Sequence, residues 1–95
     1  MEEHGVFPRH IKSFDSELWL KYEHKRSVFL KYLVKTNMIF GKTKDEVKQL
    51  LGQEGNYIPF DRWTYFIGKG IFGSRYLVVY FKEEKVKGVK IEWFK

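Results

Sequence analysis

The chain has 95 residues, enough for one hydrophobic core and too few for two. Hydrophobic residues make up 43% and charged residues 32%, a balance that indicates a folded globular domain rather than disorder. There is no cysteine, which excludes disulfides, thiolate zinc sites, iron–sulfur clusters and thiol catalysis. No apolar run approaches about 18 residues, so the sequence predicts no membrane-spanning helix.

The charge balance is basic, with 18 lysines and arginines against 12 acidic residues and a net charge of +6. Such a charge fits nucleic acid, an anionic membrane, an acidic partner or simply solubility. Only four of these cations are arginines, which suit phosphate and base contacts best, and the lysines are spread among glutamates. The pattern therefore favours a solvated surface. The high aromatic content indicates a core rich in rings, with base stacking as the alternative.

The N-terminal residues 1–14 are mostly polar and contain Pro8, which predicts a flexible arm ahead of a single domain over residues 15–95. The first residues carry no secretory signal. We therefore expect a cytoplasmic protein, or a protein of the cell envelope if a leader was removed.

A first helical region is expected to begin at Asp15 or Ser16, whose side chains can cap free backbone amides. The amphipathic pattern continues to about Lys35. Because residues 23–27 are polar on all sides, one long helix or two shorter helices both fit. Asn37 is the expected end of this region.

The clearest predicted element is a helix of about nine residues that begins at Thr43. Thr43 and Glu46 have the spacing of a capping box, in which each side chain accepts a hydrogen bond from the other residue's amide. Three apolar residues then share one face: Val47, Leu50 and Leu51. Gly52 is expected to end the helix with a positive φ. A helix this short is not stable alone, so it must pack on the rest of the domain.

After this helix the hydrophobic period changes from 3.6 to 2. Strands are expected over residues 62–67, 75–82 and 86–94. A glycine-rich turn at 68–74 and a polar turn at 83–84 join them, and connections this short make the strands antiparallel. The expected fold is a two-layer α+β domain in which two N-terminal helices pack on a three-stranded antiparallel sheet, in the order ααβββ. Lysines along the third strand are expected to protect its edge from pairing with another chain.

Two glycine-containing motifs match parts of nucleotide-binding loops but lack their context. Residues 68–73, GKGIFG, match G-x-G-x-x-G, yet a strand follows where a dinucleotide site needs a helix. Residues 41–43, GKT, match the end of a Walker A loop, but Thr36 stands where that loop needs its first glycine. A hairpin loop and a helix cap are the favoured interpretations.

No catalytic or metal-binding pattern is evident in the sequence. The histidines, His4, His10 and His24, show no ligand spacing. The adjacent carboxylates at 45–46 and 83–84 belong to a helix cap and a turn, where no burial would raise a pKa for acid–base work. We therefore expect no enzyme activity, no cofactor and no metal.

Residues 38–52 read MIFGKTKDEVKQLLG, which combines an apolar residue and glycine, a threonine cap, Glu-Val and a final Leu-Leu-Gly. This pattern resembles the signature of the SmpA/OmlA (BamE-like) domains, which are related to the beta-lactamase-inhibitor-protein-like (BLIP-like) fold. The resemblance extends over roughly residues 14–94. One departure is Glu54, because the family usually has proline there.

The resemblance implies the helix–helix–strand–strand–strand order and no enzyme activity. Known members of the family are bacterial binding modules. Some are envelope lipoproteins that brace barrel-assembly machinery, and others are inhibitors that present the open sheet face to a partner.

The sheet face turned away from the helices is the expected binding surface. Exposed aromatic rings among charged residues are typical of protein–protein interfaces, and scattered surface rings without a role are the alternative. The candidate residues are Tyr76, Tyr80 and Phe94 beside Arg75 and Lys90. We expect a non-catalytic domain that binds another protein. A basic nucleic-acid-binding or polyanion-binding domain is the alternative, and the oligomeric state is open.

Overall fold

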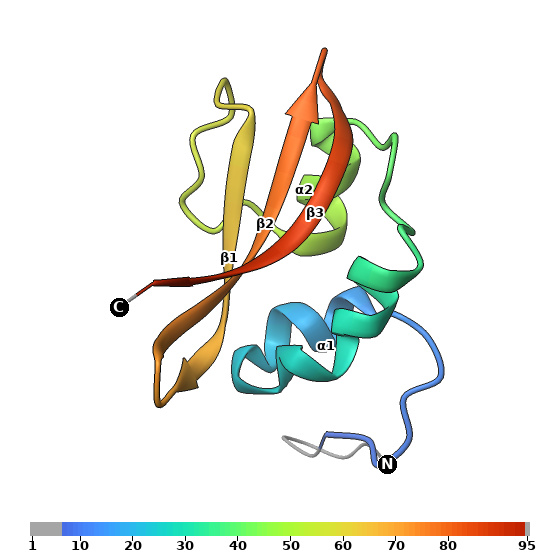
Figure 1. The fold of residues 1–95 in the computed structure, drawn as a ribbon. Helices are drawn as coiled ribbons and strands as arrows, with labels where there is room; N and C mark the ends of the chain where they lie inside the picture. The colour runs from blue at the N-terminus through green and yellow to red at the C-terminus, as the bar shows by residue number, and fades with distance from the viewer. Residues whose placement is uncertain (1–6, 95) are drawn as a thin grey trace.

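The computed structural model describes residues 7–94. Helical segments precede the strands, in the order α1 (Ser16–Lys21), η1 (Glu23–Phe29), η2 (Lys31–Lys35), α2 (Lys44–Leu51), β1 (Arg62–Gly70), β2 (Gly73–Lys82) and β3 (Lys85–Phe94). The strands form one antiparallel sheet in the order β1-β2-β3, and the helical segments pack on one side of it (Figure 1). The predicted α+β fold is confirmed.

The first helical region is divided more finely than predicted. The α-helix α1 starts after Asp15, whose carboxylate accepts a hydrogen bond from the Leu18 amide at 3.0 Å. It ends at Tyr22, where φ and ψ of −114° and 75° leave the helical region. η1 is a 3-10 helix and η2 is a π-helix. In a 3-10 helix residues three apart share a face, so η1 turns both Arg26 and Phe29 inward.

The segment before α1 is attached to the domain. Residues 7–14 form no helix or strand, and Phe7, Ile11 and Phe14 are partly buried against the core. The Tyr32 hydroxyl donates a hydrogen bond to the Ile11 carbonyl at 2.9 Å. Residues 1–6 of the predicted arm lie outside the described residues.

The predicted capping box of α2 is confirmed. The Glu46 amide donates to Thr43 Oγ1 at 3.2 Å, and the Thr43 amide donates to Glu46 Oε1 at 2.8 Å. The bond to the Thr43 amide lowers the pKa of the Glu46 carboxyl below its ordinary value. Gly52 follows the helix at φ 83° and ψ 176°, a conformation that is nearly restricted to glycine.

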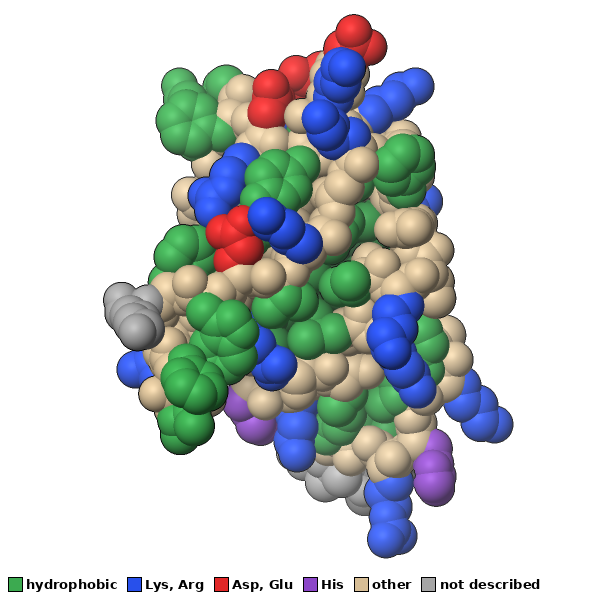
Figure 2. Space-filling view, in the orientation of Figure 1, with side chains coloured by type: hydrophobic (Ala, Val, Ile, Leu, Met, Phe, Trp, Pro, Cys, Tyr) green, Lys and Arg blue, Asp and Glu red, His purple; other side chains and the backbone are tan. Residues whose placement is uncertain are grey.

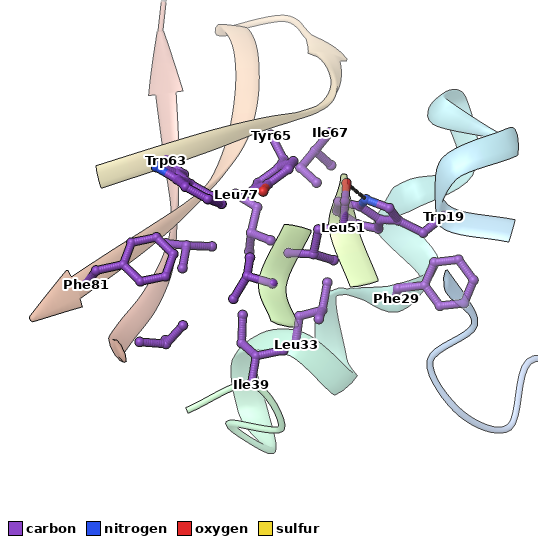
Figure 3. Packing of buried hydrophobic residues seen from close by; sticks show 13 residues of the cluster. Trp19, Phe29, Leu33, Ile39, Leu51, Trp63, Tyr65, Ile67, Leu77 and Phe81 are labelled. Atoms are coloured by element: carbon purple, nitrogen blue, oxygen red, sulfur yellow. Dashed lines mark hydrogen bonds between the residues drawn. The ribbon is translucent and has the colours of Figure 1, made fainter. Parts of the chain in front are cut away.

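The core fills the space between the helical layer and the sheet (Figure 3). Its largest fully buried side chains include Trp19, Phe29, Leu33, Leu51, Trp63, Tyr65 and Leu77. The indole of Trp19 donates to the Leu51 carbonyl at 3.1 Å, which joins α1 to the end of α2. Burial raises the pKa of the Tyr65 phenol, so Tyr65 stays protonated and donates to the Gly52 carbonyl at 2.6 Å. The prediction that α2 packs on the sheet is confirmed.

The strands are longer than predicted and carry two irregularities. β1 and β2 run through the glycine-rich motif until Gly70 pairs with Gly73, so this motif is the predicted hairpin loop. Bulges place Ile67 of β1 and Lys87 of β3 as extra residues against β2. The second hairpin turns at residues 83–84, both with positive φ, as in the two-residue turns that match strand twist.

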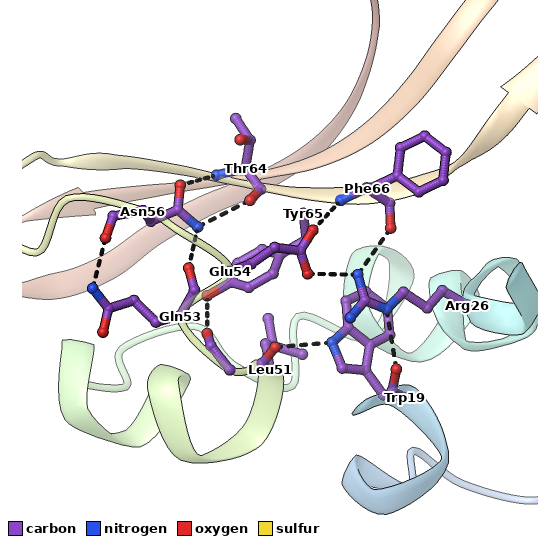
Figure 4. A network of polar contacts seen from close by, with 10 residues as sticks. Trp19, Arg26, Leu51, Gln53, Glu54, Asn56, Thr64, Tyr65 and Phe66 are labelled. Atoms are coloured by element: carbon purple, nitrogen blue, oxygen red, sulfur yellow. Dashed lines mark hydrogen bonds and ion pairs between the residues drawn. The ribbon is translucent and has the colours of Figure 1, made fainter. Parts of the chain in front are cut away.

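The free edge of β1 is closed by side chains rather than by another strand (Figure 4). The amide side chain of Asn56 accepts from the Thr64 N–H at 3.0 Å and donates to the Thr64 carbonyl at 2.9 Å. The Glu54 carboxylate accepts from the Phe66 N–H at 2.7 Å, and Arg26 donates to the Phe66 carbonyl at 3.0 Å. The loop after α2, together with Arg26 of η1, therefore gives this edge the hydrogen bonds that a neighbouring strand would supply.

Candidate functional site

The candidate site is the face of the sheet turned away from the helices, called the outer face below. Alternation and register place these residues on it: Arg62, Thr64 and Phe66 of β1, Ser74, Tyr76, Val78 and Tyr80 of β2, and Gly88, Lys90, Glu92 and Phe94 of β3. The sheet residues that pack with helical residues in the core point to the opposite side. No helix in residues 7–94 packs against the outer face.

An aromatic row crosses the outer face near the hairpin that joins β1 and β2. The Phe66 and Tyr76 rings meet edge to face at a centroid distance of 5.7 Å, and Tyr76 and Phe94 do so at 5.2 Å. The guanidinium carbon of Arg62 lies 6.0 Å from the centre of the Phe94 ring. Phe94 is 41% exposed, and the other two rings are partly exposed. The row gives three strands one continuous apolar strip with a cation beside it.

A polar cluster centred on Glu92 lies on the outer face next to the aromatic row. The Tyr80 hydroxyl donates to Glu92 Oε2 at 2.7 Å, Arg62 donates to Oε1 at 3.0 Å, and the Lys90 Nζ lies 3.3 Å from Oε2. The bond from Tyr80 is the largest cause that lowers the pKa of the Glu92 carboxyl, and the bonds from Lys90 and Arg62 act in the same direction. The contact with Glu92 raises the pKa of Lys90. Both cations are thus engaged by one carboxylate.

A hollow lies beside the polar cluster, at the end of the sheet near the start of β1. It is lined by Pro59, Phe60, Asp61, Arg62, Tyr80, Phe81 and Lys87. Phe60 and Tyr57 are 62% and 63% exposed, and their rings meet edge to face at 5.0 Å. The hollow joins exposed aromatic surface to the charged part of the outer face, so a side chain of a bound molecule can enter there.

The structure brings together most of the predicted binding residues. Tyr76, Tyr80, Lys90 and Phe94 all lie on the outer face. Arg75 does not, because alternation turns it to the helix side of β2, opposite Trp93, with its guanidinium carbon 5.7 Å from the Trp93 ring. The expectation that Arg75 lies beside these tyrosines is therefore wrong.

No protein-family model, curated protein or solved structure matches the chain. The resemblance to the SmpA/OmlA domains therefore stays a prediction. The structure bears on one departure from that pattern: Glu54 has φ 52°. A proline ring holds φ near −65°, so proline does not fit the observed backbone at Glu54.

Three residues of the aromatic row and the polar cluster were not among the predicted binding residues: Arg62, Phe66 and Glu92. The alternation of the predicted first strand already separated Arg62 and Phe66 from the core residues Trp63 and Tyr65. The contacts of Arg62 with Phe94 and Glu92, by contrast, join β1 to residues about 30 positions away, and no local pattern contains that register.

Within residues 7–94 no group of three or more His, Asp and Glu side chains is placed to hold a metal ion. No helix in this part of the chain has the length and apolar character needed to cross a membrane.

Proposed function

We propose that the chain is a non-catalytic protein-interaction domain that binds its partner on the outer face. The observation that carries the proposal is the aromatic row of Phe66, Tyr76 and Phe94 on a sheet face that no described helix covers. Aromatic side chains supply large contact area at a low cost in conformational entropy and are enriched at the centres of protein interfaces. Arg62 next to the row adds the other residue type that interfaces favour.

The distribution of charge on the outer face supports a protein partner over a nucleic acid. Arg62 and Lys90 share the carboxylate of Glu92, and Tyr80 donates its hydroxyl to the same group. A phosphate backbone would have to displace this internal carboxylate from both cations, and it would meet the negative charge of Glu92. A protein surface with apolar side chains and its own hydrogen-bonding groups needs no such exchange. The resemblance to SmpA/OmlA domains points the same way, because known members are binding modules.

The proposal is tested with a paired set of variants in an affinity capture followed by direct binding measurements. The double substitution Tyr76→Ser and Phe94→Ser removes two rings of the row. The matched control, Phe40→Ser and Leu20→Ser, removes two apolar side chains that are 61% and 50% exposed and lie away from the outer face and the hollow. We expect the captured partner to bind the control like the wild type and the outer-face variant at least about tenfold more weakly.

Two results would count against a protein-binding outer face. If the outer-face variant unfolds while the control does not, the rings are structural, so unfolding midpoints are measured for both variants. Binding to random single-stranded or double-stranded oligonucleotides at about 50 mM salt, falling steeply as salt rises, would favour the polyanion alternative, because phosphate contacts release counterions. The control for that experiment is the same titration with Arg62→Ser.

A further inference from the structure

The two outer edges of the sheet differ in how they are closed. Side chains from Asn56, Glu54 and Arg26 close β1 at Thr64 and Phe66, as Figure 4 shows. At the other edge, the loop before α2 covers only the start of β3. There the Gly41 amide donates to the Val86 carbonyl at 2.8 Å, and the Val86 amide donates to the Lys42 carbonyl at 2.9 Å; Thr43 and Lys85 form the adjoining bridge.

The register determines which backbone groups of β3 remain free. The backbone N–H and C=O of Thr64 both point outward to Asn56. Because these groups alternate in direction along a strand, those of the next residue, Tyr65, point inward and form hydrogen bonds with Leu77 of β2. The neighbouring Val78 then faces β3 and pairs with Lys90. Alternation leaves the N–H and C=O groups of three residues pointing away from the sheet: Val89, Ile91 and Trp93.

These outward groups form an open strand edge. No hydrogen bond joins them to another residue within the part of the chain that the structure describes. In Figure 1, β3 is the front strand, and no other segment is drawn over its C-terminal half. Figure 2 shows the same side, with hydrophobic side chains along the middle between lysines and arginines on both sides. The open stretch covers residues 88–94, and its central residue is Ile91.

We propose that two copies of this chain associate by antiparallel pairing of their β3 edges, with Ile91 opposite Ile91 of the second copy. This register places Lys90 opposite Glu92, Val89 opposite Trp93, and Gly88 opposite Phe94, each pair occurring twice because of the two-fold axis. All residues of the open stretch then have a partner. The loop at residues 41–43 lies beyond the paired stretch in both copies.

Each of these pairs is complementary. On the outer face, Lys90 and Glu92 bring opposite charges together, which stabilises cross-strand pairs. Phe94, now 41% exposed, covers the bare backbone of Gly88. On the helix side, Trp93, now 48% exposed, packs beside Val89. The pairing therefore gives two exposed rings per chain additional contacts without opposing like charges.

Neighbouring registers lack this complementarity. If the axis moves by one residue toward the N-terminus, Lys90 lies opposite Lys90 of the second copy. If it moves by one residue toward the C-terminus, Glu92 lies opposite Glu92. Like charges directly opposite destabilise a strand pair, so the charges select the axis at Ile91. In this pairing Lys90 meets a complementary charge, and the edge at Lys85 is covered within the chain by the loop before α2.

The dimer extends the sheet to six strands and keeps both helical layers on one side, so it also doubles the outer face. The pairing does not depend on the proposed function.

A single strand pair buries less area than a standard interface, so we expect a dissociation constant on the order of 10–100 μM. Sedimentation velocity over a concentration series should show a reversible monomer–dimer equilibrium.

A charge-exchange experiment tests the register. Lys90→Glu alone places two acidic residues opposite each other, and Glu92→Lys alone does the same with two lysines. We expect each variant to dimerise about tenfold more weakly than the wild type. Mixing the two variants restores both opposite-charge pairs, so the mixture should form a heterodimer with about the wild-type affinity. Thermal unfolding of each variant verifies that it is folded.

Cross-linking gives a second readout of the same register. Because the chain has no cysteine, single substitutions report specific positions. Lys90→Cys mixed with Glu92→Cys should form an intermolecular disulfide under mild oxidation, because opposite residues of a non-hydrogen-bonded pair are close enough for one. Lys90→Cys mixed with Lys69→Cys should not. A wild type that stays monomeric up to millimolar concentration, a dimer insensitive to both charge variants, or binding of an acidic extended peptide in place of a second copy would each overturn the proposal.

Discussion

The Arg26 guanidinium and the Glu54 carboxylate lie 2.7 Å apart at the edge of β1, where they replace a neighbouring strand. Arg26 is 4% exposed, and its Nε also donates to the Trp19 carbonyl at 3.0 Å. Its guanidinium carbon lies 4.5 Å from the centre of the Trp19 ring. One side chain thus links the end of α1, the loop after α2 and the edge of β1.

Arg26→Ala should lower the free energy of unfolding by about 3 kcal/mol, because it leaves two carbonyls and a carboxylate without their donor in a buried position. Urea denaturation measures this change. Arg9→Ala is the matched control, since Arg9 is exposed and its loss should change stability by less than about 0.5 kcal/mol. Equal denaturation midpoints for the two variants would show that the Arg26 network contributes nothing measurable.

A second prediction concerns Asn56, which closes the same edge at Thr64. Asn56→Ala removes both hydrogen bonds to Thr64, so the Thr64 amide should exchange with solvent much faster. Asn56→Asp keeps the acceptor for that amide and loses only the donor, so exchange there should stay slow. Amide hydrogen exchange followed by NMR distinguishes the two variants. A Thr64 amide that remains equally protected in Asn56→Ala would mean that another group closes the edge.

The order of elements was predictable because each element has local signals. Thr43 and Glu46 mark the start of α2, Gly52 marks its end, and a change of period marks the strands. These signals involve residues within a few positions of each other. They predict where elements begin and end better than which type of helix forms. Residues 23–29 form a 3-10 helix that turns Arg26 inward, and its partner there, Glu54, lies far along the chain.

Buried charges could not be predicted, because their partners come from distant loops. Lys44 is 5% exposed, yet its Nζ donates to the Ile58 carbonyl at 2.7 Å and lies 3.3 Å from Asp61. The sequence alone shows Lys44 only as a charged residue directly after the helix cap Thr43, a position that predicts an exposed side chain. The outer face was partly predictable from alternation, which correctly grouped Tyr76 with Tyr80. The misplacement of Arg75 arose because it was grouped by nearness in sequence rather than by alternation.

Leu51→Ala should lower the free energy of unfolding by about 2–5 kcal/mol, because Leu51 is fully buried where α2 meets the sheet. Leu20→Ala makes the same chemical change at a side chain that is 50% exposed, and it should cost about 1 kcal/mol. Thermal and urea denaturation of both variants measure the difference. A cost below about 0.5 kcal/mol for Leu51→Ala would show that α2 does not pack on the core.

The polar cluster on the outer face predicts a specific pH dependence. The pKa of Glu92 is lowered in the folded state, chiefly by the Tyr80 hydroxyl, so the folded protein binds the Glu92 proton less readily than the unfolded chain. The stability from this carboxylate is therefore complete above its unfolded pKa of about 4.3 and is lost as the pH falls through the lower folded value.

Tyr80→Phe should raise the pKa of Glu92 toward the ordinary value. An NMR titration that follows the chemical shift of the Glu92 carboxyl carbon measures this change. Tyr76→Phe is the control, because no hydrogen bond joins the Tyr76 hydroxyl to Glu92. An unchanged Glu92 titration in Tyr80→Phe would mean that Arg62 and Lys90 alone hold the carboxylate.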